Sequence, residues 1–289
     1  MGQELCGSAP NSKEVNQRMP ETKENRPVRR YRLRPETVAT DRGEGPPLVL
    51  CHGTLMDRTM FDSQVEGLSD EYRVVAYDTR ARTDQYADYY DLYDLADDCA
   101  ALMDGKGIDS CVLGGTAMGG LMALRFADRY PERLDGLVLI DTTAGTLTKD
   151  EREQYRIIMK EMRRSEDLPE KYVGLVKRML FGDTTLQENP EVVDAWVDRM
   201  FTYPWQAVHH EMDSWLDRPD FTSKLDSIDV PALVVHGEED LALKPARSDS
   251  LVEKLDARRV IVPEAGHSAN MENPAPVNEA IREFLENLY

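Results

Sequence analysis

An alanine occupies the position at which the surrounding sequence pattern predicts a catalytic nucleophile. Residues 115–120 read G-T-A-M-G-G, and they lie between an apolar run at 110–114 and a helical pattern at 121–127. A strand, a sharp turn and a helix in this order are the context of the nucleophile elbow G-x-S-x-G, in which a strained turn exposes a serine at the end of a sheet. The serine position is Ala117, whose methyl group cannot attack a carbonyl. The chain therefore either has lost an acyl-transfer nucleophile or has a task that needs none.

Three further motifs follow apolar strand patterns along the chain. His52-Gly53-Thr54 follows the apolar run Pro47–Cys51, and Asp240 stands in a G-x-x-D sequence just after Pro231–His236. His267 stands in G-H-S after a last apolar run, and the tripeptide E-N-P follows it a few residues later. Elbow, acid and histidine in this chain order are typical of the α/β-hydrolases and differ from the order in chymotrypsin or subtilisin.

These motifs resemble those of the α/β-hydrolase superfamily, and most of all its lidded members with S-M-G-G elbows, namely enol-lactonases, meta-cleavage product hydrolases and non-haem haloperoxidase-like esterases. The resemblance implies that Asp240 is the acid, that His267 is the base, and that Ala117 stands at the nucleophile position. It also implies that the backbone amides of Thr54 and Met118 form an oxyanion hole, which would stabilise the negative charge of an acyl-transfer intermediate.

Other polar residues near these motifs have structural explanations. Asp141 ends an apolar run where some members of the superfamily carry an alternative acid, but Asp240 already fills that role. His52 is expected to be structural, because the resemblance implies that its loop acts through its backbone, and His236 is expected to be a packed residue at a strand end. Thr116 lies one residue from the tip of the elbow, so its hydroxyl should point away from the base and is a poor substitute nucleophile.

No metal or cofactor is expected. His209 and His210 are adjacent on a helical pattern, and adjacent residues on a helix face different ways. No carboxylate or cysteine completes a metal-ligand spacing with them. The four cysteines also follow no such spacing, and a reducing compartment suits them.

The charge of the chain limits its partners. Its 54 acidic residues exceed its 35 basic ones, giving a formal net charge of −19, so a nucleic acid would be repelled. An acid excess with few lysines resembles proteins from a high-salt cytoplasm, which predicts a halophilic surface; the alternative is an ordinary acidic soluble protein. No apolar stretch is long enough for a signal peptide or a membrane span, so the chain is expected to be cytoplasmic. The expected partner is a small-molecule substrate, and the sequence leaves a homodimer open.

The elements that must position the motifs alternate between strand and helix. Residues 1–27 are polar, without periodicity, and are expected to be a disordered tail. From an edge strand at 29–34 onward, the alternation predicts an α/β fold with a mostly parallel, doubly wound sheet. The expected core comprises residues 28–145 and 230–289, and residues 146–229 are expected to form an inserted helical lid.

No strand pattern occurs in the expected lid, where the helical patterns are 151–162, 170–180, 190–201 and 204–216. All three tryptophans of the chain lie there. Apolar side chains of such a lid can form a ceiling over the substrate, and the alternative is that they only hold the lid together. The residues expected to contact substrate are Leu55, Trp196, Met200, Trp205 and Trp215.

Three functions remain open at this point. The first is a serine hydrolase of a small ester, lactone or related carbonyl compound whose nucleophile has been replaced, as in a variant made to trap its substrate. The second is an enzyme that lacks the serine by nature and uses His267 with Asp240 for proton transfer alone, as a lyase or cyclase would. The third is a pseudoenzyme that binds a small molecule or a protein.

Overall fold

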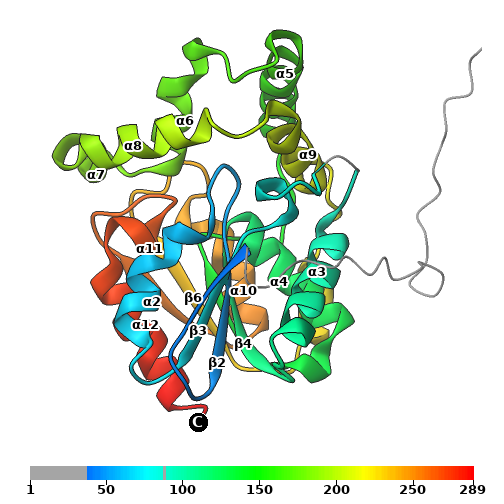
Figure 1. Cartoon of the computed structure of the whole chain (residues 1–289), viewed down its shortest axis with the longest axis vertical. Coiled ribbons are helices and arrows are strands. Elements are labelled where there is room, and N and C mark those ends of the chain that lie inside the picture. The colour runs from blue at the N-terminus through cyan, green and yellow to red at the C-terminus, as the bar shows by residue number, and fades with distance from the viewer. Residues whose placement is uncertain (1–37, 87–88) are drawn as a thin grey trace, which may run out of the picture. The chain divides into compact units, whose positions relative to one another are not determined.

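One seven-stranded sheet forms the centre of the computed structural model, which describes residues 38–86 and 89–289 (Figure 1). The strand order is β1-β3-β2-β4-β5-β6-β7. The first pair, β1 with β3, is antiparallel, and every other neighbouring pair is parallel. The strands are β1 (Ala39–Arg42), β2 (Pro47–Cys51), β3 (Arg73–Tyr77), β4 (Cys111–Thr116), β5 (Leu134–Ile140), β6 (Ala232–Gly237) and β7 (Arg258–Val262).

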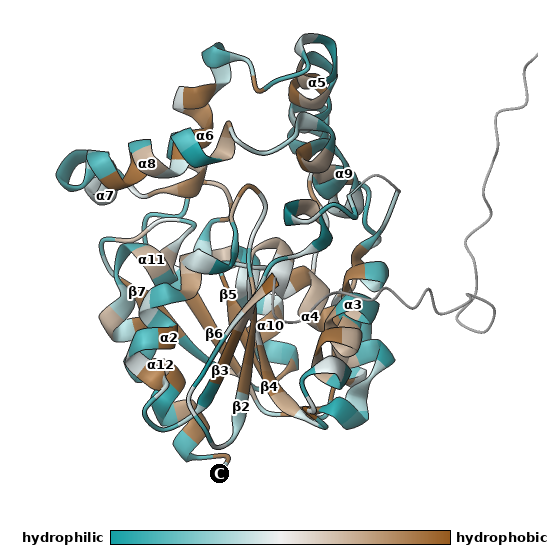
Figure 2. Cartoon of the chain, in the orientation of Figure 1, coloured by the Kyte–Doolittle hydropathy of each residue, from teal (hydrophilic) through white to brown (hydrophobic). Residues whose placement is uncertain are grey.

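Helices cover both faces of this sheet, because its strands are apolar on both sides. Successive side chains of a strand point to opposite faces. Leu48 and Leu50 of β2 therefore pack in one core, and Val49 and Cys51 pack in the other. Figure 2 shows the hydrophobic residues concentrated in the central strands. The expected mostly parallel, doubly wound sheet is confirmed.

The two cores use different helices. The core that contains Val49 is completed by α3 (Leu92–Gly105), α4 (Met118–Arg129) and α10 (Asp249–Lys254). The core that contains Leu48 is completed by α2 (Asp62–Leu68), α11 (Ala269–Glu272) and α12 (Pro274–Glu286). The strand expected at 29–34 and the tail expected at 1–27 lie outside the described residues.

Five α-helices separate β5 from β6 and gather at the end of the sheet where β2, β4 and β6 end (Figure 1). We call them the helical insertion, and they are α5 (Lys149–Ser165), α6 (Val173–Leu180), α7 (Asp183–Glu188), α8 (Pro190–Met200) and α9 (Trp205–Leu216). A capping box starts α5, in which Thr148 accepts from the amide of Glu151 and Glu151 accepts from the amide of Thr148. In the part of the chain that the structure describes, no helix has the length and apolar character needed to cross a bilayer.

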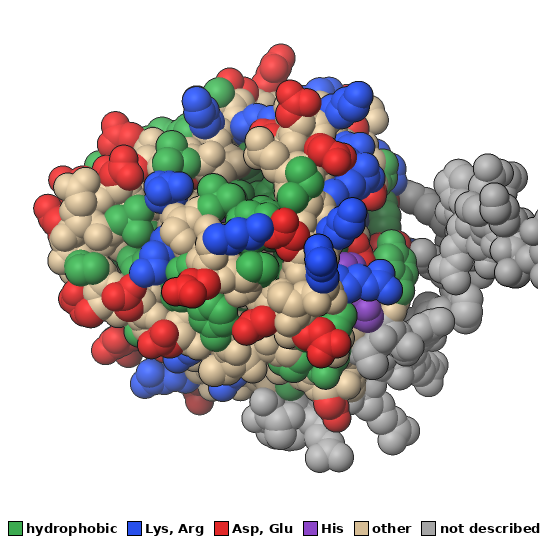
Figure 3. Space-filling model, turned by 90° about the horizontal axis from the view of Figure 1, so that it is seen from above, with side chains coloured by type: hydrophobic (Ala, Val, Ile, Leu, Met, Phe, Trp, Pro, Cys, Tyr) green, Lys and Arg blue, Asp and Glu red, His purple; other side chains and the backbone are tan. Residues whose placement is uncertain are grey.

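Acidic side chains are spread over the face seen in Figure 3, with arginines and lysines between them. Because the net charge is −19, repulsion among carboxylates should destabilise the fold when salt is low. Salt shortens the range of that repulsion from about 30 Å at 0.01 M to about 3 Å at 1 M. Between these conditions we expect KCl to raise the Tm by about 5 °C, or roughly 2 kcal/mol for a domain of this size.

Calorimetric scans from low salt to molar KCl would test this expectation. At the isoelectric pH the net charge is zero, so the same titration there should give a much smaller shift. A Tm that is flat or falling with KCl at neutral pH would reject a halophilic surface.

Candidate active site

A strained turn between β4 and α4 carries Ala117. Its φ of 51° and ψ of −111° lie in a region that residues with a side chain rarely adopt. Two glycines permit this turn, because a Cβ at Gly115 would lie 2.3 Å from the backbone of Gly119, and a Cβ at Gly119 would lie 2.1 Å from the carbonyl oxygen of Cys51. The backbone of Ala117 is held by a 2.9 Å bond from its amide to the carbonyl of Ile140. The turn thus keeps the conformation of an elbow although its tip is a methyl group.

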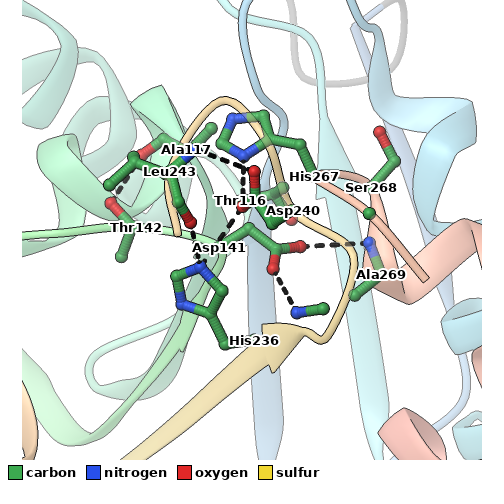
Figure 4. A network of polar contacts seen from close by, with 12 residues as sticks. Thr116, Ala117, Asp141, Thr142, His236, Asp240, Leu243, His267, Ser268 and Ala269 are labelled. Atoms are coloured by element: carbon green, nitrogen blue, oxygen red, sulfur yellow. Dashed lines mark hydrogen bonds and ion pairs between the residues drawn. The ribbon is translucent and has the colours of Figure 1, made fainter. Parts of the chain in front are cut away.

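A histidine and a carboxylate meet beside this turn. His267 follows β7, Asp240 follows β6, and the distance between Nδ1 of His267 and Oδ2 of Asp240 is 2.7 Å (Figure 4). Burial alone would lower the pKa of His267, but the charge of Asp240 and its hydrogen bond raise it to about 9. Burial alone would raise the pKa of Asp240, but His267 and further donors hold it below its usual value. The buried carboxylate of Asp240 therefore orients the imidazole of His267 and favours its protonated form.

A second histidine supports the carboxylate from its other side. His236 is fully buried, and its Nε2 lies 2.5 Å from the carbonyl oxygen of Leu243 and 3.2 Å from Oδ2 of Asp240 (Figure 4). The amide of Leu243 donates to Oδ1 of Asp240 at 2.8 Å. His236 is thus more than the packed strand-end residue that the sequence indicates, because it helps to fix the carboxylate that holds His267.

Asp141 ties the same loops together without bonding to His267. Its Oδ1 accepts from the amide of Gly237 at 2.8 Å, and its Oδ2 accepts from the amide of Ala269 at 3.0 Å. Burial raises the pKa of this carboxyl to about 6. Together with His236 and Asp240, it forms a group whose ligand atoms lie within 4.8 Å of one another and could hold a metal ion. Each carboxylate oxygen of Asp141 and Asp240 already takes part in one of the hydrogen bonds just described.

The loop after β2 faces the elbow. His52 fixes it, because its Nδ1 bonds to the carbonyl of Gly53 at 2.8 Å and its Nε2 accepts from the amide of Thr79 at 3.0 Å. Helix α4 begins at Met118, so the amide of this residue has no acceptor inside the helix. Thr54 and Met118 both lie on the wall of the cavity that also contains Ala117.

That cavity lies between the elbow and the helical insertion, and its walls are mostly apolar. The core supplies the loop after β2, the elbow and the histidine loop, and α5, α6 and α9 supply the facing wall. The predicted site residues that line it together are Thr54, Leu55, Ala117, Met118, Trp215 and His267. Asp240 stands behind His267, and its side chain is buried. Leu243, Met212, Tyr155 and Met162 also line the cavity.

Three residues expected to contact substrate are not among those that line the cavity. Trp196 lies under the guanidinium of Arg199, whose carbon is 4.7 Å from the centre of the indole ring. Met200 is buried in the core that contains Leu48, and Trp205 packs against the other core and the ring of His209. Aromatic content alone did not distinguish these packing positions from the cavity wall, since all of them lie on amphipathic helices.

Thr116 has its hydroxyl oxygen 3.3 Å from Oδ1 of Asn270. Two residues that the sequence did not predict bear most on the site. One is Tyr155, whose ring meets that of Trp215 edge to face at 5.2 Å, and the other is Glu211. Glu211 is fully buried and bonds to the loop after β2. A carboxylate four residues before a tryptophan on one helix is a weak signal, because most such carboxylates face solvent.

Comparison with known proteins agrees with the fold. Residues 46–274 match the family described as alpha/beta hydrolase fold. The chain is 25% identical over 243 residues to 3-oxoadipate enol-lactonase 2 of Acinetobacter baylyi, covering 83% of this chain and 89% of that one. A thermophilic esterase structure from Thermogutta terrifontis has a TM-score of 0.81 at 32% identity, covering 86% and 93% of the two chains. The enol-lactonase of Burkholderia xenovorans LB400 has a TM-score of 0.77 at 26% identity, covering 86% and 95%.

Proposed function

Since the chain belongs to the α/β-hydrolase fold family, we propose that its cavity binds a small carboxylic ester or lactone for acyl transfer of the Ser-His-Asp type. The chain carries alanine where the serine of such a site would stand, so it represents a form without the nucleophile. The observation that carries the proposal is the 2.7 Å contact between His267 and Asp240 beside a strained elbow at Ala117. Relatives described as esterases and enol-lactonases support the same substrate class.

The mechanism follows for a chain with serine at position 117. The serine oxygen attacks the carbonyl carbon, and His267 takes its proton while Asp240 keeps the imidazole oriented. The carbonyl oxygen becomes an anion, which the amides of Thr54 and Met118 stabilise. His267 then gives the proton to the leaving oxygen, and water releases the acyl group by the same steps. With alanine present, we expect the substrate to bind and to turn over very slowly.

The helical insertion is proposed to act as a lid over this cavity. Its residues Tyr155, Met162 and Trp215 form the wall that faces Ala117. A lid closed over the substrate excludes water and strengthens the electrostatic interactions of the oxyanion with its donors. The apolar wall favours an uncharged acyl group of aliphatic or aromatic character.

An Ala117→Ser variant tests the proposal. It should hydrolyse short acyl p-nitrophenyl esters, and a second change of His267→Ala in that variant should remove the gain. If the folded serine variant is no faster than the alanine chain across a broad panel of esters, the proposal is wrong.

Proton transfer without a nucleophile is the second candidate. The observation that favours it is the intact pair of His267 and Asp240 in a chain whose elbow bears only a methyl group. Such a site could serve a lyase or a cyclase, with His267 as the base. This candidate requires the unmodified chain to have an activity that depends on pH and is lost in His267→Ala, whereas a binding protein without catalysis would show none.

Ligand binding should change the fluorescence of one tryptophan in particular. Trp215 lines the cavity, whereas Trp196 and Trp205 pack elsewhere. Titrating a small aromatic ester into the alanine chain should change the emission saturably, with no turnover to obscure it. Trp215→Phe should remove most of the response, and Trp196→Phe and Trp205→Phe are the matched controls that should retain it. A response that survives Trp215→Phe would mean that the ligand binds elsewhere.

A further inference from the structure

Helix α9 of the insertion contacts the loop that carries the proposed oxyanion donor. Oε2 of Glu211 accepts from the amide of Leu55 at 3.1 Å. One turn later on α9, Nε1 of Trp215 donates to the hydroxyl oxygen of Thr54 at 2.9 Å. Residues four apart on a helix share a face, so the two side chains reach the loop together.

Arg82 connects the same carboxylate to the next residue of the loop. Its Nη2 donates to Oε2 of Glu211 at 2.9 Å, and its Nε donates to the carbonyl oxygen of Met56 at 2.7 Å. The ring of Tyr203 covers the guanidinium, with the central carbon 4.0 Å from the ring centre. Three successive loop residues, 54 to 56, are therefore held by a set of side chains centred on α9.

The loop conformation depends on being held. Leu55 has a φ of 65°, which is left-handed and unfavourable for a residue with a branched side chain. Such a conformation costs about 1–3 kcal/mol and persists only when its surroundings fix it. The amide of Leu55, immediately after the proposed donor Thr54, is the group that Glu211 fixes. The direction of the Thr54 amide therefore depends on this contact.

The buried ion pair between Glu211 and Arg82 carries a desolvation cost that limits its contribution to the stability of the fold. The side chains of Glu211 and Arg82 are 0% and 3% exposed, and a buried ion pair often contributes little net stability because both charges lose their hydration. Oε1 of Glu211 has no hydrogen-bond partner among the described residues. If the contact between the helical insertion and the core were purely structural, apolar side chains could provide it equally well.

We infer that Glu211 and Trp215 are positioning residues, through which helix α9 sets the Thr54 amide for the oxyanion of the substrate. The inference rests on the proposed function, and it makes the oxyanion hole depend on the docking of α9. Substrates would then meet a fully formed oxyanion hole only when this helix is in place.

Two substitutions at Glu211 separate positioning from stability. Glu211→Gln keeps an oxygen that can accept both from Leu55 and from Arg82, whereas Glu211→Met removes both hydrogen bonds at similar volume. Both variants leave Arg82 without its counter-charge, so both should lower the Tm. Only Glu211→Met should release the loop. Asp97→Asn is the control, because it removes the charge of an ion pair with Arg129 between α3 and α4, away from the loop.

Hydrogen exchange in the chain with alanine at 117 is the first measurement. Glu211→Met should speed exchange of the Leu55 amide at least about tenfold, and Glu211→Gln and Asp97→Asn should leave it near its original rate. The second measurement is kinetic, on p-nitrophenyl acetate in the Ala117→Ser background. There Glu211→Met should lower kcat by about 10- to 100-fold, less than the loss of an entire oxyanion donor, while KM changes less than about threefold.

Unchanged exchange in Glu211→Met would overturn the inference, and so would faster exchange with an unchanged kcat. If Ala117→Ser itself has no esterase activity, the proposed function fails, and exchange still decides whether α9 holds the loop. If Glu211→Met does not fold, Trp215→Phe replaces it, because it removes the bond to Thr54 and keeps an aromatic ring. That variant should speed exchange in the loop and lower kcat by about threefold, the effect of one hydrogen bond.

Discussion

Ala117→Ser should raise the rate of ester hydrolysis by about 10⁴- to 10⁶-fold over the chain with alanine. Loss of a triad nucleophile typically costs on the order of 10⁶ in kcat, and the oxyanion hole and binding leave a residual rate. All other parts of the proposed site are present around Ala117, including the base, its carboxylate and an elbow already in its strained conformation. The added hydroxyl therefore needs no rearrangement of the backbone. The rate should be measured with p-nitrophenyl acetate and butyrate, with active-site titration to exclude a trace contaminant.

The same variant should show a particular pH dependence. His267 acts as a base only when it is neutral, and the contact with Asp240 raises its pKa to about 9. The rate should consequently rise with pH, about tenfold per unit, and level off once His267 is deprotonated. In Ala117→Ser with His267→Ala this rise should disappear. A rate that is flat between pH 6 and pH 9 would show that His267 is not the base.

The sequence was sufficient to predict the sheet and the placement of Ala117, Asp240 and His267 close together at one edge of it. Strand patterns ending in G-x-x-D and G-H-S predicted where Asp240 and His267 would stand, because the carboxyl ends of parallel strands meet at one edge of a sheet. The elbow could be predicted because its tight turn requires glycines at fixed positions around Ala117, and Gly115 and Gly119 stand there. Local sequence suffices for such features, since each depends on a strand end and the few residues after it.

Contacts between distant segments could not be predicted in this way. Glu211 and Leu55 are 156 positions apart, and the sequence around neither residue indicates that they form a hydrogen bond. The short helix α7 was missed because six residues are too few for a periodic pattern, and the pattern at 170–180 proved to be a 3₁₀ turn followed by α6. Trp196 and Trp205 have the same residue type as Trp215, and only the packing of the insertion decides which one reaches the cavity.

Asp240→Asn in the Ala117→Ser background should lower kcat by about 10⁴-fold, because an amide cannot hold the imidazole in the required tautomer or stabilise its positive charge. Asp141→Asn is the matched control, since Asp141 is as deeply buried and belongs to the same cluster. Within the part of the chain that the structure describes, its oxygens accept from the backbone amides of Gly237 and Ala269. Its replacement should therefore cost stability, about 1–3 kcal/mol for a disturbed buried hydrogen bond, and less than about tenfold in kcat.

The comparison of these two variants decides which carboxylate is the acid of the site. Single-turnover rates should be measured at pH 8, with the circular dichroism of the aromatic side chains and the Tm recorded for each protein to separate misfolding from lost chemistry. The 2.7 Å contact with His267 favours Asp240 for the proposed role, while Asp141 stands where the resemblance to the superfamily implies that some members carry an alternative acid. If a folded Asp141→Asn loses more activity than Asp240→Asn, the assignment is reversed. The hydrogen bonds of Asp141 to the two loops would then have to rearrange during catalysis so that its carboxylate could reach His267.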